Sequence, residues 1–228
     1  SGGRANSRQV KQYLNDADVI FGVGGSFALT ACGVPMPANK DGSKTFIHAT
    51  LDPMDLNKDV PVQHGLIGDA KLTLQALSAE MENYGKAPAE QRAAEPEKIA
   101  AIRDAWRGEW LPKLTSNDTP INPYRVIAEL DRMVDKDNVV ITHDAGSPRD
   151  QTTPFWEATA PLSYIGWGKT TQLGYGLGLA MGAKLAAPEK LCINVWGDAA
   201  IGFTGMDFET AVRENIPILS ILFNNFSM

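Results

Sequence analysis

The sequence predicts an α/β fold in which parallel sheets are flanked by helices. Short apolar runs that end in glycine or in a polar residue alternate along the chain with segments of helical periodicity. This alternation is typical of βαβ units, whose consecutive strands lie parallel in one sheet. The chain has 228 residues, of which 43% are hydrophobic, so it is long enough to bury a sizeable core.

The first pattern covers residues 1–82. Its apolar runs stop at glycine or proline, so we expect buried strands there, and the segments beside them have helical periodicity. Strands are expected at residues 18–25 and 44–53, and helices at residues 7–17 and 67–81. Asp69 is the expected N-cap of the second helix, and Leu74, Leu77 and Met81 form its apolar face.

Residues 83–120 are rich in Ala, Pro, Glu and Lys and are interpreted as a linker. Within it, four large apolar residues recur at helical spacing; these are Ile99, Ile102, Trp106 and Trp110. We expect one amphipathic helix here, and we expect its Trp side chains to pack against the surface of a domain.

A second α/β pattern covers residues 121–228. It begins with a helix that Asn122 caps and that has Pro123 at its first position. Strands are expected at 137–144, 190–198 and 216–225, helices at 122–134, 173–186 and 204–215, and a loop at 145–156. Thr204 and Asp207 are expected to form a capping box.

Composition excludes several classes of partner. The net charge is −6 and no Lys/Arg cluster exceeds a pair, which argues against nucleic acid. No apolar run is long enough to cross a bilayer. Cys32 and Cys192 lie far apart and form no CxxC motif, which favours buried thiols in a reducing, cytoplasmic compartment; a disulfide between them stays open as the alternative.

The polar residues that follow two neighbouring strands predict a metal site. Asp198 follows the strand at 190–198, and Asn224 and Asn225 end the next strand. The carboxyl ends of parallel strands meet at one edge of a sheet, where ligands bind. Carboxylate and amide oxygens suit Mg²⁺, which takes its other ligands from phosphates, water and backbone carbonyls. The small Ala199 and Ala200 allow the backbone to approach a diphosphate.

This pattern resembles the metal and diphosphate motif of thiamine diphosphate-dependent enzymes, and particularly their acetolactate synthase branch. The stretch "GWGKTTQLGYGLGLAMGAKLAAP" is similar to the cofactor-facing helix entry of that family, and "ADVIFGVGGSF", "FIHATLDPMDL" and "VPVQHGLIGDAKLTLQAL" resemble its central domain. The resemblance implies that residues 1–82 are the second half of a Rossmann-like central domain. Residues 121–228 are then the first part of a thiamine diphosphate- and Mg-binding domain.

The resemblance also implies site residues. The Asp198 carboxylate, the Asn225 side-chain oxygen and the Ser227 carbonyl would bind Mg²⁺. Leu173 matches the bulky position that forces the two cofactor rings into a V, and the Thr171 carbonyl would accept a hydrogen bond from the aminopyrimidine. The implied cofactor-binding residues are Ala145, Gly146, Thr171, Leu173, Gly197, Asp198, Ala199, Ala200 and Asn225.

The implied function is thiamine diphosphate- and Mg²⁺-dependent decarboxylation of a 2-oxo acid with carboligation, in a homodimer or homotetramer. An FAD- or ADP-like ligand is an expectation for the central domain. A simple 2-oxo acid or acyl-CoA decarboxylase and a non-catalytic nucleotide-binding relative stay open as alternatives. The family's activating Glu belongs to a preceding domain, so we expect this chain to be an internal piece of a roughly twofold longer polypeptide.

Two positions depart from the family pattern. Ala199 stands where the family usually has Gly, and Ser147, Pro148 and Arg149 replace the usual Gln-His-Gln run. Arg149 is an alternative ligand for a substrate carboxylate, which it can hold by a bidentate pair.

The glycines and histidines allow further expectations. The glycines at 174, 176, 178 and 182 lower the helix propensity of this segment. We expect close approach to a cofactor or to a partner subunit to offset that loss of stability. The "GVGGS" stretch is interpreted as a tight strand-end turn. His48 in a strand and His64 in a loop are expected to be structural, whereas His143 is a candidate for lining the pocket.

Overall fold

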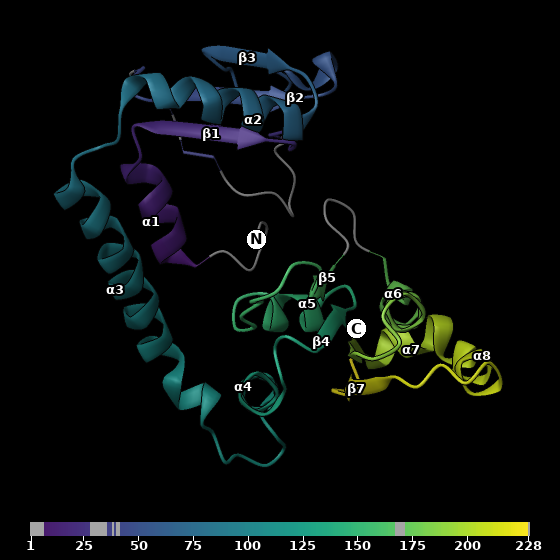
Figure 1. The fold of residues 1–228 in the computed structure, drawn as a ribbon. Coiled ribbons are helices and arrows are strands. Elements are labelled where there is room, and N and C mark those ends of the chain that lie inside the picture. Colours follow the sequence, from purple (N-terminus) through teal and green to yellow (C-terminus); the bar gives the residue numbers. More distant parts are fainter. Residues whose placement is uncertain (1–6, 28–35, 38, 40–41, 167–171, 228) are drawn as a thin grey trace. The chain divides into compact units, whose positions relative to one another are not determined.

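The computed structural model describes residues 7–27, 36–37, 39, 42–166 and 172–227 (Figure 1). It divides into two compact units, Gly2–Glu109 and Trp110–Met228. Both units contain a parallel sheet with helices beside it, as the sequence predicts.

The sheet of the first unit has three parallel strands in the order β1-β2-β3. They are β1 (Val19–Val23), β2 (Thr45–Thr50) and β3 (His64–Ile67). The central strand β2 carries most of the core, since Phe46, His48 and Ala49 are buried in it. The expectation that His64 lies in a loop is wrong: His64 begins β3 and pairs with Ile47. All four residues of β3 are exposed. The strand therefore lacks the alternation of buried and exposed positions that a period-two apolar pattern in a sequence predicts.

The helices of this unit begin where their caps predict. Helix α1 (Arg8–Asp16) starts after Ser7, whose hydroxyl accepts from Val10 N–H at 3.2 Å. Helix α2 (Ala70–Met81) starts after Asp69, whose carboxylate accepts from Leu72 N–H at 3.0 Å. A short 3₁₀ turn, η2 (Pro53–Asp55), follows β2, and another, η3 (Glu82–Tyr84), follows α2.

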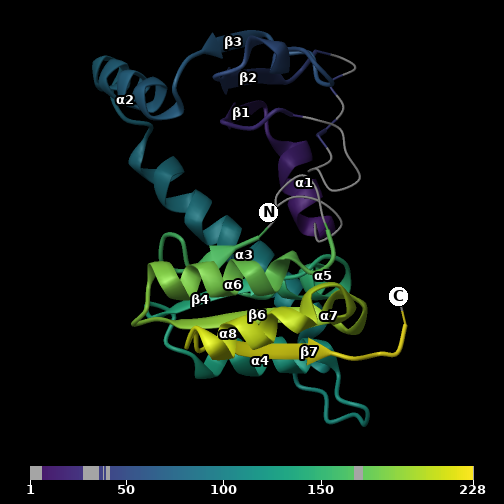
Figure 2. The ribbon, with the colours of Figure 1, turned by 90° about the vertical axis from the view of Figure 1, so that its right-hand side faces the viewer.

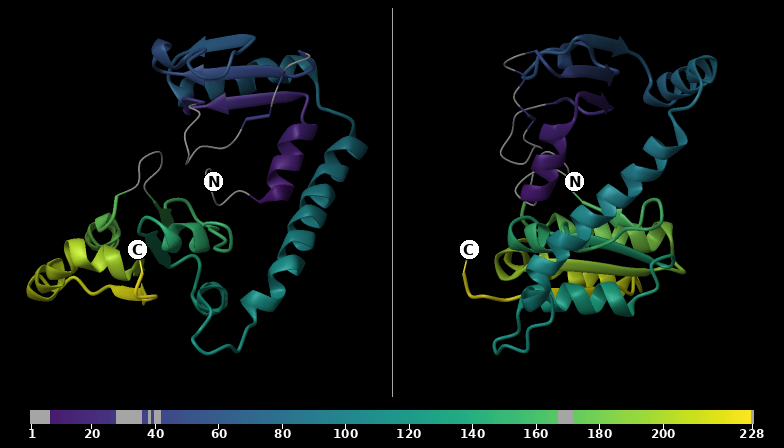
Figure 3. Two further views of the ribbon diagram at one scale, coloured as in Figure 1. Left: turned by 180° about the vertical axis from the view of Figure 1, so that it is seen from behind. Right: turned by 90° about the vertical axis from the view of Figure 1, so that its left-hand side faces the viewer.

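Burial in this unit is lower than the sequence suggests. Only Ile20 is buried in β1, and the face of α2 formed by Leu74, Leu77 and Met81 is exposed. Figures 1 and 3 show α2 beside the sheet. An apolar pattern therefore predicted the elements correctly, but not their burial.

The glycine-rich stretch after β1 forms a turn at the strand end. Gly24 has φ +67° and its N–H donates to the Ala49 carbonyl at 3.0 Å. An added Cβ at Gly22 would lie 2.3 Å from the Phe27 ring, which itself stacks on His48 at 4.6 Å between ring centroids. Glycine is required at position 22 because the Phe27 ring occupies the space that a side chain at this position would need.

The predicted linker helix is α3 (Ala89–Leu114), 26 residues long. Near its start, Glu95 accepts a hydrogen bond from the Tyr13 hydroxyl of α1 at 3.0 Å. Near its end, the Trp110 ring lies 4.9 Å from Tyr124 and 5.2 Å from Phe155. Trp110 thus packs on the aromatic rings of Tyr124 and Phe155, and the interpretation of this segment as a linker stays a prediction.

The second unit contains a four-stranded parallel sheet in the order β5-β4-β6-β7. The strands are β4 (Val139–His143), β5 (Tyr164–Ile165), β6 (Leu191–Gly197) and β7 (Leu219–Phe223). The α-helices are α4 (Pro123–Met133), α5 (Ser147–Thr152), α6 (Tyr175–Ala186), α7 (Asp198–Thr204) and α8 (Phe208–Arg213). Figures 1 and 2 show α6, α7 and α8 on one face of this sheet and α4 and α5 on the other.

The core of this unit lies on β4 and β6, whose side chains are nearly all buried. Ile127 of α4 and Leu177 of α6 reach the core from opposite faces of the sheet. Strand β7 contains no buried residue, so its predicted burial is wrong. It lies at the end of the strand order, where one edge lacks a neighbouring strand in the described part of the chain.

Two local predictions in this unit are also wrong. The expected loop at 145–156 contains α5, whose helical period is hidden by Pro148 and by its short length. The single helix expected at 204–215 begins earlier, as α7, and continues through the 3₁₀ turn η4 (Gly205–Asp207) into α8. Thr204 makes no capping hydrogen bond with its side chain; its hydroxyl donates to the Gly174 carbonyl at 2.8 Å.

Within the described residues, no helix is both long enough and apolar enough to cross a membrane.

Candidate functional site

A cavity of about 800 Å³ lies in the second unit, at the carboxyl ends of its strands. Nine of the ten sequence-predicted site residues line it: Ala145, Gly146, Leu173, Gly197, Asp198, Ala199, Ala200, Asn225 and Ser227. The tenth, Thr171, lies outside the described residues. The remaining lining residues are Pro120, Ile121, Pro123, Val126, Ser147, Pro148, Gln151, Ile221, Leu222, Phe223, Asn224 and Phe226.

Strand pairing explains why Asp198 and Asn224 come together. Gly197, the last residue of β6, pairs in register with Phe223, the last residue of β7. Asp198 and Asn224, which follow these two paired residues, therefore leave the sheet next to each other at the same edge. Asp198 begins α7, and its carboxylate accepts from Ala199 N–H at 3.0 Å.

The two asparagines are held by turns of their own backbone. The Asn224 side-chain oxygen accepts from Phe226 N–H, and that of Asn225 accepts from Ser227 N–H, both at 3.0 Å. These are Asx-type turns, which orient the amides at the strand end. An amide oxygen has two lone pairs, so each retains the capacity for one further partner.

The loop after β4 forms the opposite wall. Ala145 is buried, and Gly146 has φ +77°, a conformation that favours glycine over residues with a side chain. Pro148 in the first turn of α5 packs close to Gly197, since a Cβ added there would lie 3.8 Å from the proline ring. This contact joins α5 to the turn that carries Asp198.

Asp144, which belongs to none of the sequence motifs described above, organises this wall. It is fully buried, and its carboxylate accepts from Ala145 N–H at 2.8 Å, from Gly174 N–H at 3.0 Å and from Gly176 N–H at 3.1 Å. A buried carboxylate is stable when such donors surround it. The only signal in the sequence is an acidic residue directly after an apolar strand.

The glycines at the start of α6 pack against the protein itself. An added Cβ at Gly174, which has φ +94°, would lie 2.8 Å from Thr204, and one at Gly176 would lie 2.6 Å from the side chain of Asn194. The low helix propensity of these two glycines is therefore offset by close packing within the protein itself. Gly178 and Gly182 have open space at their Cβ positions in the described part of the chain.

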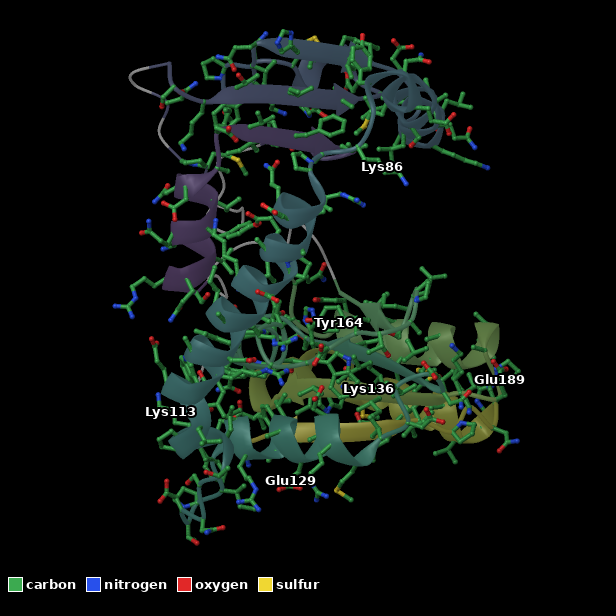
Figure 4. The ribbon with its side chains drawn as sticks, turned by 60° about the vertical axis from the view of Figure 1, so that its left-hand side comes forward. Lys86, Lys113, Glu129, Lys136, Tyr164 and Glu189 are labelled. Atoms are coloured by element: carbon green, nitrogen blue, oxygen red, sulfur yellow. The ribbon has the colours of Figure 1, made fainter. Side chains whose placement is uncertain are left out.

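His143, the candidate pocket residue, is not among the described residues that line the cavity. It is buried beside Tyr175, whose hydroxyl lies 3.4 Å from Nδ1, and Tyr164, whose ring lies 5.3 Å away. Burial lowers the pKa of His143, which keeps the imidazole neutral. Burial also raises the pKa of Tyr164, labelled in Figure 4, to about 12.

Arg149, the alternative carboxylate ligand, is engaged within its own helix. Its guanidinium forms an ion pair with Asp150 at 2.8 Å, and it does not appear among the described lining residues of the cavity. The structure therefore gives no geometry in which Arg149 faces a ligand there.

The donor set fits a hard divalent cation with a phosphate ligand. It combines the Asp198 carboxylate, the Asn225 amide oxygen and the backbone at Ser227, all on the cavity wall. Within the described residues, no group of three or more His, Cys, Asp and Glu side chains is placed to hold a metal. A metal in this cavity would therefore depend on amide, backbone and ligand oxygens.

Comparisons with known proteins match both units. The central domain of thiamine pyrophosphate enzymes matches residues 1–77, and their C-terminal thiamine pyrophosphate-binding domain matches residues 144–228. The acetolactate synthase large subunit of Mycobacterium tuberculosis is 33% identical over 225 residues, which are 97% of this chain and 38% of the relative. The acetolactate synthase isozyme 3 large subunit of Escherichia coli is 27% identical over 223 residues, covering 98% of this chain and 38% of the relative. The chain thus spans 38% of the length of these relatives.

Proposed function

Because the chain belongs to the thiamine pyrophosphate enzyme family, we propose that it forms part of an acetolactate synthase-like enzyme. In this proposal, the enzyme uses thiamine diphosphate and Mg²⁺ to decarboxylate a 2-oxo acid and to join the product to a second carbonyl compound. The observation that supports it most is the register pairing of Gly197 with Phe223, which brings Asp198 and the asparagine pair to one cavity.

The residues have distinct proposed roles. Asp198, Asn225 and the Ser227 carbonyl hold the metal, which neutralises the diphosphate. The backbone around Ala145, Gly146, Ala199 and Ala200 approaches the phosphate oxygens, because these residues are small. When bound, thiamine diphosphate supplies a thiazolium ring that accepts the electrons released by loss of CO₂.

The apolar part of the wall orients and shields the ligand. Leu173 lines the cavity beside the start of α6 and supports the bent cofactor in this proposal. Pro148, Ile221 and Phe223 add apolar surface that excludes water from the metal end. Exclusion of water strengthens the electrostatic interactions inside such a site.

The activating Glu is proposed to come from outside this chain. No Glu is among the described residues that line the cavity. We further propose a homodimer or homotetramer in the cytoplasm with a small 2-oxo acid as substrate, and an FAD- or ADP-like ligand in the central domain. Analytical ultracentrifugation tests the oligomer, and a sedimentation coefficient of a monomer at micromolar concentration would contradict it.

Calorimetry with thiamine diphosphate and Mg²⁺ tests the site. We expect Asp198→Ala to abolish the Mg²⁺-dependent part of the affinity, because Asp198 is the one carboxylate among the described residues of the wall. Asp207→Ala is the matched control, since Asp207 is exposed, lies in the η4 turn and does not line the cavity. Equal affinity of Asp198→Ala and wild type would remove the proposed metal role.

Product analysis tests the reaction. The complete polypeptide is incubated with pyruvate as the sole substrate. Acetolactate supports carboligation, whereas acetaldehyde alone supports the simple decarboxylase. If neither forms while the cofactor binds, the substrate assignment is wrong and a non-catalytic relative is the better reading.

A further inference from the structure

His143 lies between the end of β5 and the start of α6. It is only 3% exposed, and the Tyr175 ring of α6 stands edge-on to it, with 6.5 Å between the ring centroids and 80° between the planes. At the far side of the imidazole, a Cβ added to Gly166 would lie 2.4 Å from Nε2. The imidazole therefore fills the space between these two segments, and close packing leaves it little room to move.

His143 and the residue after it hold the same part of α6. Nδ1–H of His143 donates to the Asp144 carbonyl at 3.1 Å, since a carbonyl oxygen can only accept. The Asp144 carboxylate accepts from Gly174 N–H at 3.0 Å and from Gly176 N–H at 3.1 Å. The Tyr175 hydroxyl lies 3.4 Å from His143 Nδ1. Three consecutive residues at the start of α6 are thus in contact with the end of β4.

Leu173 directly precedes these three residues and lines the cavity. In the proposed function it supports the thiamine rings, whereas Asp198 and Asn225 hold the metal at the phosphate end. His143 is not among the described residues that line the cavity, so its effect on a ligand must pass through its neighbours. A side chain that touches no ligand can fix the position of one that does.

From these contacts we propose that His143 is a positioning residue whose imidazole fixes the start of α6, and thereby the place of Leu173 against the thiamine rings. This inference rests on the proposed function, because the ligand is the cofactor named there. The effect is confined to the ring end of the cavity. The phosphate end lies on β6 and β7, so it keeps its geometry when the imidazole is removed.

Calorimetry on the complete polypeptide with two ligands, each in the presence of Mg²⁺, tests the proposal. Thiamine diphosphate occupies both ends of the cavity, and inorganic pyrophosphate occupies only the phosphate end. We expect His143→Asn to weaken binding of thiamine diphosphate about tenfold and binding of pyrophosphate less than about twofold. The Asn amide keeps a donor near the place of Nδ1–H but leaves a gap at Gly166, so the start of α6 is held less firmly.

His48→Asn is the matched control. It makes the same change at a fully buried strand histidine of the first unit, which is not among the described residues that line the cavity. Both ligands should bind this variant as they bind wild type.

A double-mutant cycle shows whether His143 acts through Leu173. Leu173→Ala alone should weaken binding of thiamine diphosphate. In that background His143→Asn should cause a further loss of less than about twofold, because the side chain that it positions is absent.

Gly166→Ala gives a second route to the same displacement and keeps the test decisive if His143→Asn does not fold. Its methyl would meet Nε2 at 2.4 Å, so it must displace the imidazole while His143 itself is kept. We expect the same selective loss of thiamine diphosphate affinity. Gly182→Ala is the control, since its methyl meets open space in the described part of the chain.

Equal losses for the two ligands in His143→Asn would show a general effect on folding and would overturn the assignment. So would wild-type affinity for thiamine diphosphate in both His143→Asn and Gly166→Ala, or fully additive losses in the double variant. If these variants bind as wild type while Asp198→Ala loses binding, the proposed function stands without His143. If wild type binds neither ligand with Mg²⁺, both proposals fall.

Discussion

The carboxylate of Asp144 accepts a hydrogen bond from Gly174 N–H at 3.0 Å, which ties the end of β4 to the start of α6. The two residues are 30 positions apart, and both are buried. Their contact joins the loop at Ala145 to the segment that carries Leu173. Both of these residues line the cavity, so the buried carboxylate connects two parts of its wall.

Replacement of Asp144 should lower stability strongly. In Asp144→Asn, one acceptor oxygen becomes a donor that faces backbone N–H groups. We expect a loss of about 3 kcal/mol in the free energy of unfolding, because buried N–H groups lose a charged partner. Urea denaturation measures it, and Asp137→Asn on the exposed surface is the control. A change below about 1 kcal/mol in Asp144→Asn would contradict the role.

The glycines of α6 should respond in opposite directions. In Gly176→Ala the new methyl meets the Asn194 side chain at 2.6 Å and the backbone N of Asp144 at 3.2 Å, so we expect a loss of about 2 kcal/mol. In Gly182→Ala the methyl meets open space in the described structure, and the gain in helix propensity should be up to about 1 kcal/mol. Thermal and urea denaturation of the two variants give the comparison. Equal effects of the two substitutions would show that the close packing at Gly176 is not a constraint.

Acid should destabilise the protein through His143. Burial lowers its pKa in the folded state, so the folded protein holds the neutral imidazole and the unfolded chain takes up the proton first. The stabilising contribution is complete above the unfolded pKa of about 6.5 and is lost as the pH falls toward the folded value. His143→Asn should flatten the dependence of unfolding free energy on pH between about 5 and 7. His64→Asn, at an exposed strand residue, should leave that slope as in wild type.

Alkali should destabilise the protein through Tyr164. Its folded pKa of about 12 exceeds the usual value of 10.0, mainly because of burial, so the folded state favours the neutral phenol. The stabilising contribution is complete below pH 10 and is lost as the pH rises toward 12, by about 3 kcal/mol in total.

The variant Tyr164→Phe isolates this effect. It loses the hydrogen bond between the Tyr164 and Thr153 hydroxyls at 2.7 Å, which should lower stability by about 1 kcal/mol near neutral pH. Above pH 10 its stability should fall less steeply than that of wild type. Tyr84→Phe, at a residue that is 80% exposed, is the control. A Tyr164→Phe protein with the wild-type alkaline slope would contradict the assignment.

Several contacts in the second unit stabilise its surface without entering the cavity. The Lys136 ammonium, labelled in Figure 4, lies 3.6 Å from the centre of the Trp156 ring and forms an ion pair with Asp131. Glu129 on α4, also labelled there, accepts from Arg125 at 2.8 Å and from Arg132 at 2.6 Å. None of these side chains is among the described residues that line the cavity, so their contribution is to the scaffold.

Features that depend on a few neighbouring residues were predictable. Asn122 caps α4 through Tyr124 N–H at 3.1 Å, and Asp69 caps α2, because each cap is formed within three positions along the chain. The strands at 139–143 and 191–197 were visible as apolar runs that end in a polar residue or glycine. The convergence of Asp198 and Asn225 on one cavity also followed, because parallel strands place their carboxyl ends at one edge of a sheet.

Features that depend on contacts between distant segments were not predictable. Helix α5 is short and begins around a proline, so its stability comes from packing against β6 and α4, and a periodic pattern is absent. Thr204 donates to the Gly174 carbonyl, 30 residues away, in preference to a local capping box.

The sequence by itself determined the α/β architecture, the starts of α1, α2 and α4 and the two strand ends that carry the proposed metal ligands, because these follow from local propensity and from the geometry of parallel sheets. Only the tertiary structure decided that Asp144 anchors Gly174 and Gly176, that His143 turns toward Tyr175 and that Gln151 reaches the cavity wall. The physical reason is that the orientation of each of these side chains depends on residues of other helices and strands. Packing and burial in the folded protein decide which of those residues it contacts.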